Sequence, residues 1–303
     1  MSYTNSLDQN LKLGIVQTSL DPASAWVSST KMEKVEEEQA ISEIKAFLSS
    51  FRQEEIPPDI ILLPELSVPT GFEKSLKNMS DSLHSVIIAG FDYRSGSLHG
   101  EVHNEALIIV PTRWRGATMG ARASVRRIGK TYAAPEEERK LKSISCTFKH
   151  DPSVWIFYGG TIGNFGVMVC YDFLDLERIA MYRGKVHHLF ILALNKDATS
   201  FRHVAEAVSR MAFCNVVICN CGHFGGSLAI SPYRLAERRT IYQHAGARLA
   251  TAQIIELPVS SIDLHQHGVD PILNGVKEYK SLPPGYRSSI SLEKHIASLA
   301  ALP

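Results

Sequence analysis

Two reactive side chains stand directly after short apolar runs of this sequence. Glu65 follows the run Ile60–Pro64 in DIILLPEL, and Cys170 ends the segment NFGVMVC. Continuous apolar runs are typical of strands buried on both faces, and α/β sheets present functional groups just past such strands. The sequence therefore offers a carboxylate and a thiol where chemistry is expected.

Cys170 has the surroundings of a nucleophile. Tyr171 and Asp172 turn the chain toward an expected helix, so the thiol would lie at a strand-to-helix turn. Exposure at a sheet edge and a nearby helix N-terminus both favour the reactive thiolate. The alternatives are ordinary ones: a free cysteine is often a small buried hydrophobe, and Glu65 could be a helix cap or the partner of an ion pair.

Lys130 is a third candidate, in the segment RRIGKTYAAPEEE. A lysine considered alone is usually a solvated surface charge. Lys130 becomes a candidate only because it lies between Glu65 and Cys170 in the chain.

The other cysteines are Cys146, Cys214, Cys219 and Cys221. An odd total of five, without the spacing of a disulfide framework, predicts a reduced protein. Cys219-Asn-Cys221-Gly-His223 could suggest a metal site, but its spacing is not that of structural zinc, and buried thiols are the favoured interpretation.

The composition is that of an ordinary globular protein. The 303 residues are 45% hydrophobic and 21% charged, with a formal net charge of +1. Such a balance gives no global attraction to nucleic acid or anionic membranes. No apolar run approaches the roughly 20 residues that span a bilayer, and the polar first ten residues lack a signal-peptide core. A cytoplasmic protein without membrane contact is expected.

Apolar runs alternate with amphipathic segments along the chain. Strands are expected at residues 11–17, 59–64, 85–91, 106–110, 154–158, 166–170, 188–194, 216–220, 227–231 and 252–257, and helices at 28–51, 175–183 and 200–215. Interleaved helices and strands predict an α/β domain whose sheets are covered by helices. We expect this domain over residues 1–260 and a tail over 261–303 that packs on the domain or on a second subunit.

Five arginines and a tryptophan make a basic stretch ahead of Lys130. A basic run with an aromatic residue can bind nucleic acid. The favoured interpretation is a solvated loop balanced by the acidic residues 136–138, with an anionic substrate group as a further alternative. The arginines are Arg113, Arg115, Arg122, Arg126 and Arg127.

These motifs, in this order, resemble the nitrilase (carbon–nitrogen hydrolase) superfamily over about residues 11–257. The resemblance rests on LPE after a strand, a lysine before a proline–acid cluster, and a strand that ends in Cys-Tyr-Asp. Further matches are Glu177-Arg178, the segment Arg210–Asn215 and the glycine–serine segment that follows Asn220. The resemblance implies a four-layer α-β-β-α sandwich and a homodimer or larger homo-oligomer, for which residues 175–183 and the tail are candidate surfaces.

The resemblance also implies an amidase-type hydrolase with a Glu-Lys-Cys triad. Cys170 would attack the carbonyl of a small-molecule amide, Glu65 would act as general base, and Lys130 would stabilise the oxyanion. Glu138 is expected to orient Lys130. Candidate contacts to the substrate or oxyanion are Tyr171 and Asn195. This cycle needs no metal and no organic cofactor.

Departures from the family pattern bear on specificity. Cys170 is followed by Tyr171-Asp172 where nitrilases usually carry Trp-Glu, which favours amides over nitriles. Leu174 and Asp175 stand where relatives acting on N-carbamoyl amino acids carry an arginine. Two alternatives remain open: acyl transfer to an amine by the same residues, and a catalytically silent interaction module. The sequence does not name the substrate, the pathway or the oligomer size.

Overall fold

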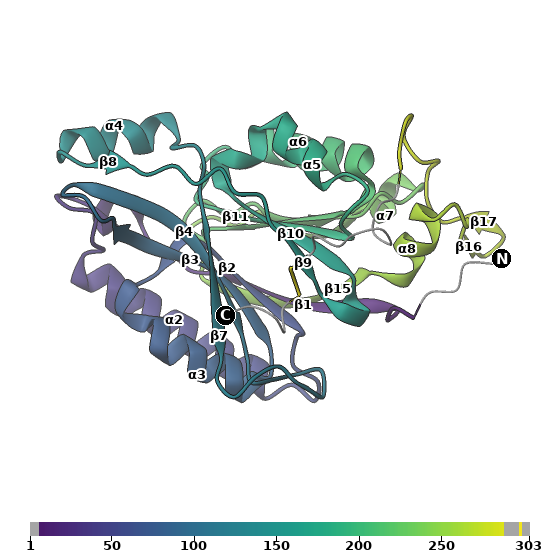
Figure 1. The fold of residues 1–303 in the computed structure, drawn as a ribbon, viewed down its shortest axis with the longest axis horizontal. Helices are drawn as coiled ribbons and strands as arrows, with labels where there is room; N and C mark the ends of the chain where they lie inside the picture. The colour runs from purple at the N-terminus through teal and green to yellow at the C-terminus, as the bar shows by residue number, and fades with distance from the viewer. Residues whose placement is uncertain (1–5, 288–296, 299–303) are drawn as a thin grey trace.

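Two β-sheets lie face to face, and helices cover their outer surfaces (Figure 1). The computed structural model describes residues 6–287 and 297–298. From one side to the other, the layers are α2 with α3, the first sheet, the second sheet, and α5 with α6 (Figure 1). The predicted α-β-β-α sandwich is confirmed.

The first sheet has the strand order β15-β1-β2-β3-β4-β7, with β8 added beside β4. β1, β2 and β3 run parallel, whereas β15, β4 and β7 pair antiparallel with their neighbours. The strands are β1 (Asn10–Gln17), β2 (Ile60–Val68), β3 (Val86–Ser95), β4 (Glu101–Val110), β7 (Ser124–Gly129), β8 (Thr147–Phe148) and β15 (Thr251–Pro258).

The second sheet has the order β14-β13-β12-β11-β10-β9-β18, with β10, β11 and β12 parallel. Its strands are β9 (Ile156–Tyr158), β10 (Asn164–Val169), β11 (His188–Ala193), β12 (Asn215–Asn220), β13 (Ser227–Ile230), β14 (Thr240–His244) and β18 (Ala297–Ser298). Two short hairpins lie outside the sheets: β5 (Arg113–Trp114) with β6 (Ala117–Thr118), and β16 (Ile272–Leu273) with β17 (Val276–Lys277).

The helices are set by apolar stripes and by local caps. Asp175 caps α5 by accepting the backbone N–H groups of Glu177 and Arg178, and Asp197 caps α6 in the same way through Ser200. The helices are α1 (Pro22–Ala25), α2 (Lys34–Arg52), α3 (Glu73–Leu83), α4 (Pro135–Ser143), α5 (Leu176–Tyr182), α6 (Ala198–Val208), α7 (Ala236–Arg239) and α8 (Ser260–Gln266).

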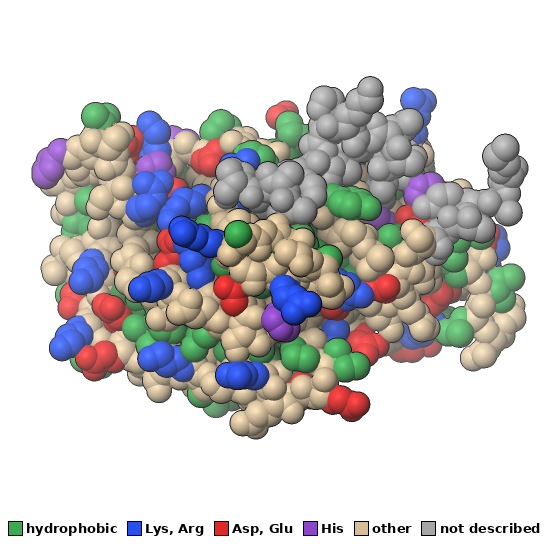
Figure 2. All heavy atoms as spheres, turned by 60° about the horizontal axis from the view of Figure 1, so that its bottom comes forward, with side chains coloured by type: hydrophobic (Ala, Val, Ile, Leu, Met, Phe, Trp, Pro, Cys, Tyr) green, Lys and Arg blue, Asp and Glu red, His purple; other side chains and the backbone are tan. Residues whose placement is uncertain are grey.

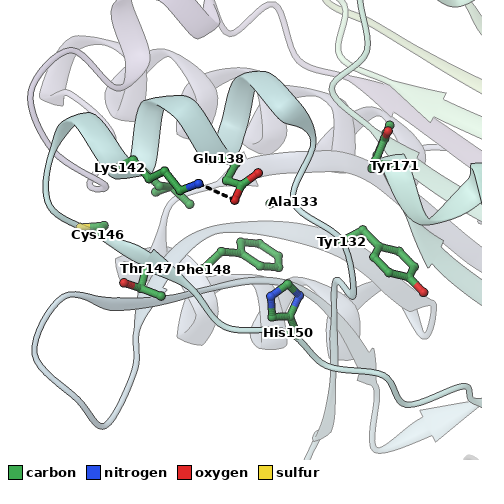
Figure 3. A pocket seen from close by; sticks show the side chains of 10 residues that line it. Tyr132, Ala133, Glu138, Lys142, Cys146, Thr147, Phe148, His150 and Tyr171 are labelled. Atoms are coloured by element: carbon green, nitrogen blue, oxygen red, sulfur yellow. Dashed lines mark ion pairs between the residues drawn. The ribbon is translucent and has the colours of Figure 1, made fainter.

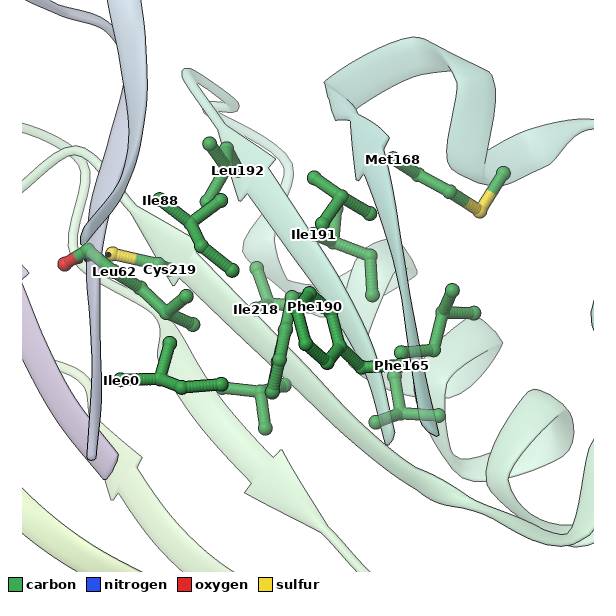
Figure 4. Close-up of a cluster of buried hydrophobic side chains, with 14 of the residues drawn as sticks. Ile60, Leu62, Ile88, Phe165, Met168, Phe190, Ile191, Leu192, Ile218 and Cys219 are labelled. Atoms are coloured by element: carbon green, nitrogen blue, oxygen red, sulfur yellow. Dashed lines mark hydrogen bonds between the residues drawn. The ribbon is translucent and has the colours of Figure 1, made fainter. Parts of the chain in front are cut away.

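The main core lies between the two sheets. On β2, Ile60 and Leu62 join this core, while the alternating Ile61 and Leu63 pack with α2 and α3 on the other face. The second sheet contributes Phe190, among others, and Figure 4 shows the interlocking side chains. A strand buried on both faces explains why DIILLP reads as one continuous apolar run.

Two predicted helices have different limits in the structure. The helix expected from Ser28 begins at Lys34, because Asp92 accepts the backbone N–H of Met32 (2.7 Å) and holds the preceding segment out of the helix. The helix expected to reach Asn215 ends as a π-helical turn, Ser209–Phe213, and Asn215 already belongs to β12.

The segment after Val259 packs beside the second sheet through α8 and Tyr279, whereas the hairpin of β16 and β17 is exposed. Ile262 of α8 and Tyr279 are buried with Phe213 and Tyr233. Asp263 lies 3.1 Å from Nε2 of the buried His187. The domain limit expected at residue 260 remains a prediction, and part of the expected tail lies outside the described residues.

Two of the five arginines before Lys130 are paired with carboxylates, and a third is stacked on an aromatic ring. Arg115 binds Asp8 and Asp59, and Arg127 binds Glu73 and Glu105. Arg126 stacks on the ring of Trp155, with 3.9 Å between the guanidinium carbon and the ring centroid. On the face shown in Figure 2, Lys and Arg side chains are interspersed with Asp and Glu. In the described part of the chain, no helix has the length and apolarity needed to cross a membrane.

Substitution of Phe190 tests the core between the two sheets. Its side chain is fully buried in the cluster between the sheets, so Phe190→Ala should lower the free energy of unfolding by about 3–5 kcal/mol, as measured by urea denaturation. Val35→Ala, at a position that is 75% exposed on α2, should change it by less than about 0.5 kcal/mol. Equal effects of the two substitutions would contradict this core.

Candidate active site

Glu65 lies inside β2, at a bulge rather than after the strand. The pairing of β2 with β3 shifts register between Leu63 and Val68, and Leu66 has a φ of 53°. Gly90 of β3 lies against the bulge, where an added Cβ would meet the carbonyl oxygen of Pro64 at 2.3 Å. The missing side chain at Gly90 therefore lets β2 bulge and aim Glu65 between the two sheets.

Cys170 directly follows β10 and begins a 3-10 turn, Cys170–Leu174. Its φ of 45° lies in the left-handed region, which costs a residue with a side chain of order 1–3 kcal/mol and is concentrated at functional sites. Asp172 in the same turn accepts the backbone N–H groups of Thr131 (2.9 Å) and Tyr132 (2.9 Å). These bonds fix the thiol turn to the loop that carries Lys130.

The ammonium of Lys130 is buried between two carboxylates. Its Nζ lies 2.8 Å from Oε1 of Glu65 and 2.6 Å from Oε2 of Glu137. Asn104 donates its Nδ2 to both carboxylates, at 2.8 Å each, and the hydroxyl of Tyr93 donates to Glu137 at 3.0 Å. The side chains of Lys130 and Glu65 are 2% and 3% exposed, so this network is shielded from water.

The pKa shifts follow from this geometry. Burial alone would lower the pKa of Lys130, but the charges of Glu65 and Glu137 outweigh it and hold that pKa well above its usual value. Burial alone would raise the pKa of Glu137, but Lys130 outweighs it and holds that pKa below its usual value. The site therefore keeps a permanent cation beside the thiol.

Burial, the charge of Glu65 and the hydrogen bond from the thiol to Glu65 raise the pKa of Cys170 well above its usual value. Lys130 and the backbone N–H of Leu194 act in the opposite direction. That N–H also donates to Oε2 of Glu65, at 3.0 Å. At neutral pH the resting thiol is therefore protonated, and Glu65 is the carboxyl group beside it.

A pocket of about 690 Å³ opens onto these groups. Glu65, Lys130, Cys170 and Glu137 all line it. Pockets that bind small molecules occupy about 300–1,000 Å³. Its apolar wall includes Trp26, Leu66, Tyr93, Phe201 and Phe224.

Glu137, and not the predicted Glu138, contacts Lys130. The side chain of Glu138 is 53% exposed and forms an ion pair with Lys142 at 2.8 Å (Figure 3). Pro135 begins α4, so Glu137 takes its third position and turns back to the backbone N–H of Ala134 (3.1 Å). Glu137 also shares a helix face with the buried Leu141, four residues later, a spacing that could have identified it from the sequence.

Tyr171 and Asn195 also line this pocket, and their predicted contacts to substrate remain predictions. The side-chain oxygen of Asn195 accepts the N–H of Asp197 at 2.9 Å, and its Nδ2 donates to the Asp197 carbonyl at 3.2 Å. Asn220 holds the backbone of Asn195 through a further pair of bonds. The Asn195 side chain thus shapes the turn before α6.

Cys219 and Cys221 are buried thiols. Cys219 donates to the carbonyl of Val16 at 3.3 Å, and Cys221 donates to the carbonyls of Thr18 and Leu20, also at 3.3 Å. Burial raises the pKa of Cys221 to about 12. Over the described residues, no group of three or more His, Cys, Asp and Glu side chains could hold a metal ion.

Glu137→Gln should lower the free energy of unfolding at pH 7 by about 1–3 kcal/mol, because the buried ammonium of Lys130 loses a charged partner. The pKa of Glu137 is held below its usual 4.5, so its stabilisation is complete above that pH and is lost as the pH falls through the lowered pKa. The difference from wild type should shrink accordingly in denaturation series at falling pH. Glu138→Gln should leave the stability close to that of wild type, because solvent screens this exposed ion pair. A larger loss of stability in Glu138→Gln than in Glu137→Gln would show that Glu138 is the residue that holds Lys130.

Glu65→Gln should lower the pKa of Cys170, because it removes the negative charge that helps to raise it. Alkylation by iodoacetamide requires the thiolate, so its pH midpoint should move to lower pH in the variant. The measurement is mass spectrometry of the peptide that contains Cys170, which separates it from the half-buried Cys146. A midpoint that stays in place or rises would show that Glu65 does not act on this thiol.

Comparison with solved structures identifies the fold. The chain is similar to Nit3 of Saccharomyces cerevisiae, a member of branch 10 of the nitrilase superfamily, with a TM-score of 0.60, 14% identity and coverage of 90% of this chain and 99% of that one. It is similar to a CN-hydrolase superfamily protein of Xanthomonas campestris with an arsenic adduct in its active site (TM-score 0.59, 13% identity, coverage 88% and 99%).

A third similar structure is a mutant amidase of Nesterenkonia sp. AN1, with the acetamide moiety of fluoroacetamide added covalently at its active-site cysteine (TM-score 0.58, 11% identity, coverage 84% and 94%). No family model and no curated protein matches the sequence. The resemblance seen in the motifs is thus confirmed at the level of structure: the chain has the fold of the nitrilase superfamily.

Proposed function

We propose that this protein is a carbon–nitrogen hydrolase that cleaves a small-molecule amide through a thioester on Cys170. The observation that supports this most is the buried ammonium of Lys130, held 2.8 Å from Glu65 and 2.6 Å from Glu137 beside a thiol at a positive-φ turn. A structural module has no need for a buried lysine, a strained cysteine and two carboxylates around one pocket.

The first step is a proton transfer within the site. The thiol of Cys170 gives its proton to Glu65, and the sulfur attacks the amide carbonyl carbon. This transfer leaves the total charge of the buried cluster unchanged, which limits its cost in a site shielded from water. The carbonyl oxygen becomes an oxyanion beside the ammonium of Lys130, with the backbone N–H of Tyr171 as a further donor.

The second step releases the amine. The carbon–nitrogen bond breaks, the leaving nitrogen takes the proton held by Glu65, and the acyl group remains on Cys170 as a thioester. Water then gives a proton to Glu65 and attacks the thioester, which frees the carboxylic acid and restores the thiol. Glu137 and Asn104 act as positioning residues, because they hold Lys130 and Glu65 at hydrogen-bond distance.

Incubation with a panel of small amides, followed by ammonia release and intact-mass measurement, tests this function. Wild type should release ammonia, and hydroxylamine should divert the acyl group to a hydroxamate, because it attacks thioesters. Cys170→Ala should abolish both signals, and Glu65→Gln should lower kcat by at least ~10²-fold, because it removes general acid–base catalysis.

Cys146→Ala is the matched control, since it removes a half-buried thiol outside the catalytic pocket and should leave turnover at the wild-type rate. Turnover that survives in Cys170→Ala would exclude the thioester. Folded wild type without turnover or adduct on any amide of the panel would favour the silent module. Products formed only with an added amine would instead indicate acyl transfer.

A further inference from the structure

Lys140 is a cation without an ionic partner on the wall of the catalytic pocket. It lies on α4, one turn after Glu137, and its side chain is half-buried. Among the described residues it forms no ion pair, and its Nζ instead lies over the ring of Trp26, 5.5 Å from the centroid. Burial lowers its pKa from the usual value, with no acidic group to counter the effect.

Two other lysines of this pocket already have carboxylate partners. Lys196 pairs with Glu136 at 2.5 Å, and Lys130 is held by Glu65 and Glu137. Arg139 lies 4.0 Å from the same Glu136 carboxylate, and its side chain is 76% exposed, so water solvates its charge. Lys140 is therefore a half-buried cation of the pocket that has no carboxylate partner among the described residues.

The wall between Lys140 and the catalytic groups is rigid. Trp26 donates its Nε1 to Asp92 at 2.7 Å and packs edge-on against Tyr93, with 6.0 Å between ring centroids. Tyr93 in turn binds Glu137. An aromatic wall thus connects Lys140 to the carboxylate that holds Lys130, and the pocket extends along it.

The sequence suggested that one of the arginines before Lys130 could bind an anionic group of the substrate. Those arginines do not line the catalytic pocket in the described part of the chain, and most are engaged elsewhere. Lys140 was not singled out by the sequence, because it is one of several charged residues in the run Glu136–Lys142.

We propose that Lys140 selects amides that carry a second, anionic group, and that it binds the carboxylate of such a substrate while the amide lies at Cys170. The proposal rests on the hydrolase function above. An ammonium that has no carboxylate partner and lies half-buried over the ring of Trp26 binds a carboxylate by a charge-assisted hydrogen bond. The pocket is large enough to hold both ends of a small molecule.

A matched substrate pair tests this selectivity. Glutaric acid monoamide carries a carboxylate, whereas pentanamide has the same chain length without a charge. Wild type should prefer the charged amide in kcat/KM, and Lys140→Met should lower kcat/KM for it by ~10–100-fold, mainly through KM, because it loses one charged hydrogen bond. Pentanamide should change less than about threefold, since methionine keeps the apolar stem over Trp26.

Lys142→Met is the matched control on the same helix. Lys142 is paired with Glu138 and lies outside the catalytic pocket, so its loss should change neither substrate. Lys140→Arg should keep most of the preference for the charged amide, because it keeps the cation. Equal losses for the two substrates in Lys140→Met, or a wild type that prefers pentanamide, would overturn the proposal.

A second readout does not depend on amide turnover. Two maleimides, one with a carboxypropyl chain and one with a butyl chain, label thiols at rates that mass spectrometry can follow at Cys170 and, as an internal reference, at Cys146. Wild type should favour the charged probe at Cys170 relative to Cys146, and Lys140→Met should remove the preference. Charge selectivity without amide turnover would contradict the hydrolase function and support the anion site. Turnover without charge selectivity would support the hydrolase function and contradict the anion site.

Discussion

The buried ammonium of Lys130 determines the arrangement of everything around it. A charge this far from water requires opposite charges at contact distance, and Glu65 and Glu137 supply them. Each carboxylate then needs its own donors, which Asn104, Tyr93 and the backbone of Leu194 provide. The result is a buried polar network that opens to Cys170 and the pocket, and in which Oδ1 of Asn104 has no hydrogen-bond partner among the described residues.

Two local features of the backbone place Glu65 and Cys170 at this network. The bulge in β2 turns Glu65 inward, and Gly90 leaves the space for it. The positive φ of Cys170 bends the chain away from β10, and Asp172 fixes that bend to the loop after β7. The strained backbone conformation of Cys170 persists because the surrounding hydrogen bonds hold the chain in place.

The sequence predicted the features that depend on hydrophobic pattern and chain order. The ten predicted strands, the helix after Cys170 and the grouping of Glu65, Lys130 and Cys170 follow from apolar runs and from their resemblance to known motifs. The sequence did not predict β7 and β14, because their residues are polar or only partly buried and form no apolar run. Glu138 was wrong by one position, because the proline–acid motif gives the residue type but not the face of α4 on which it lies. The position of the Leu194 N–H and the contact between Lys140 and Trp26 could not be predicted from the sequence. Both arise where segments far apart in the chain meet.

The site is divided between the two sheets. Glu65 and Lys130 belong to the first sheet, whereas Cys170 and the N–H of Leu194 follow strands of the second. Neither half carries the chemistry alone: a single sheet exposes either an ordinary cysteine or an isolated carboxylate–lysine pair. The arrangement of Glu65, Lys130 and Cys170 therefore exists only when the two sheets are packed together. Under the proposed function, amide turnover requires the complete sandwich, whereas simple alkylation of the thiol does not.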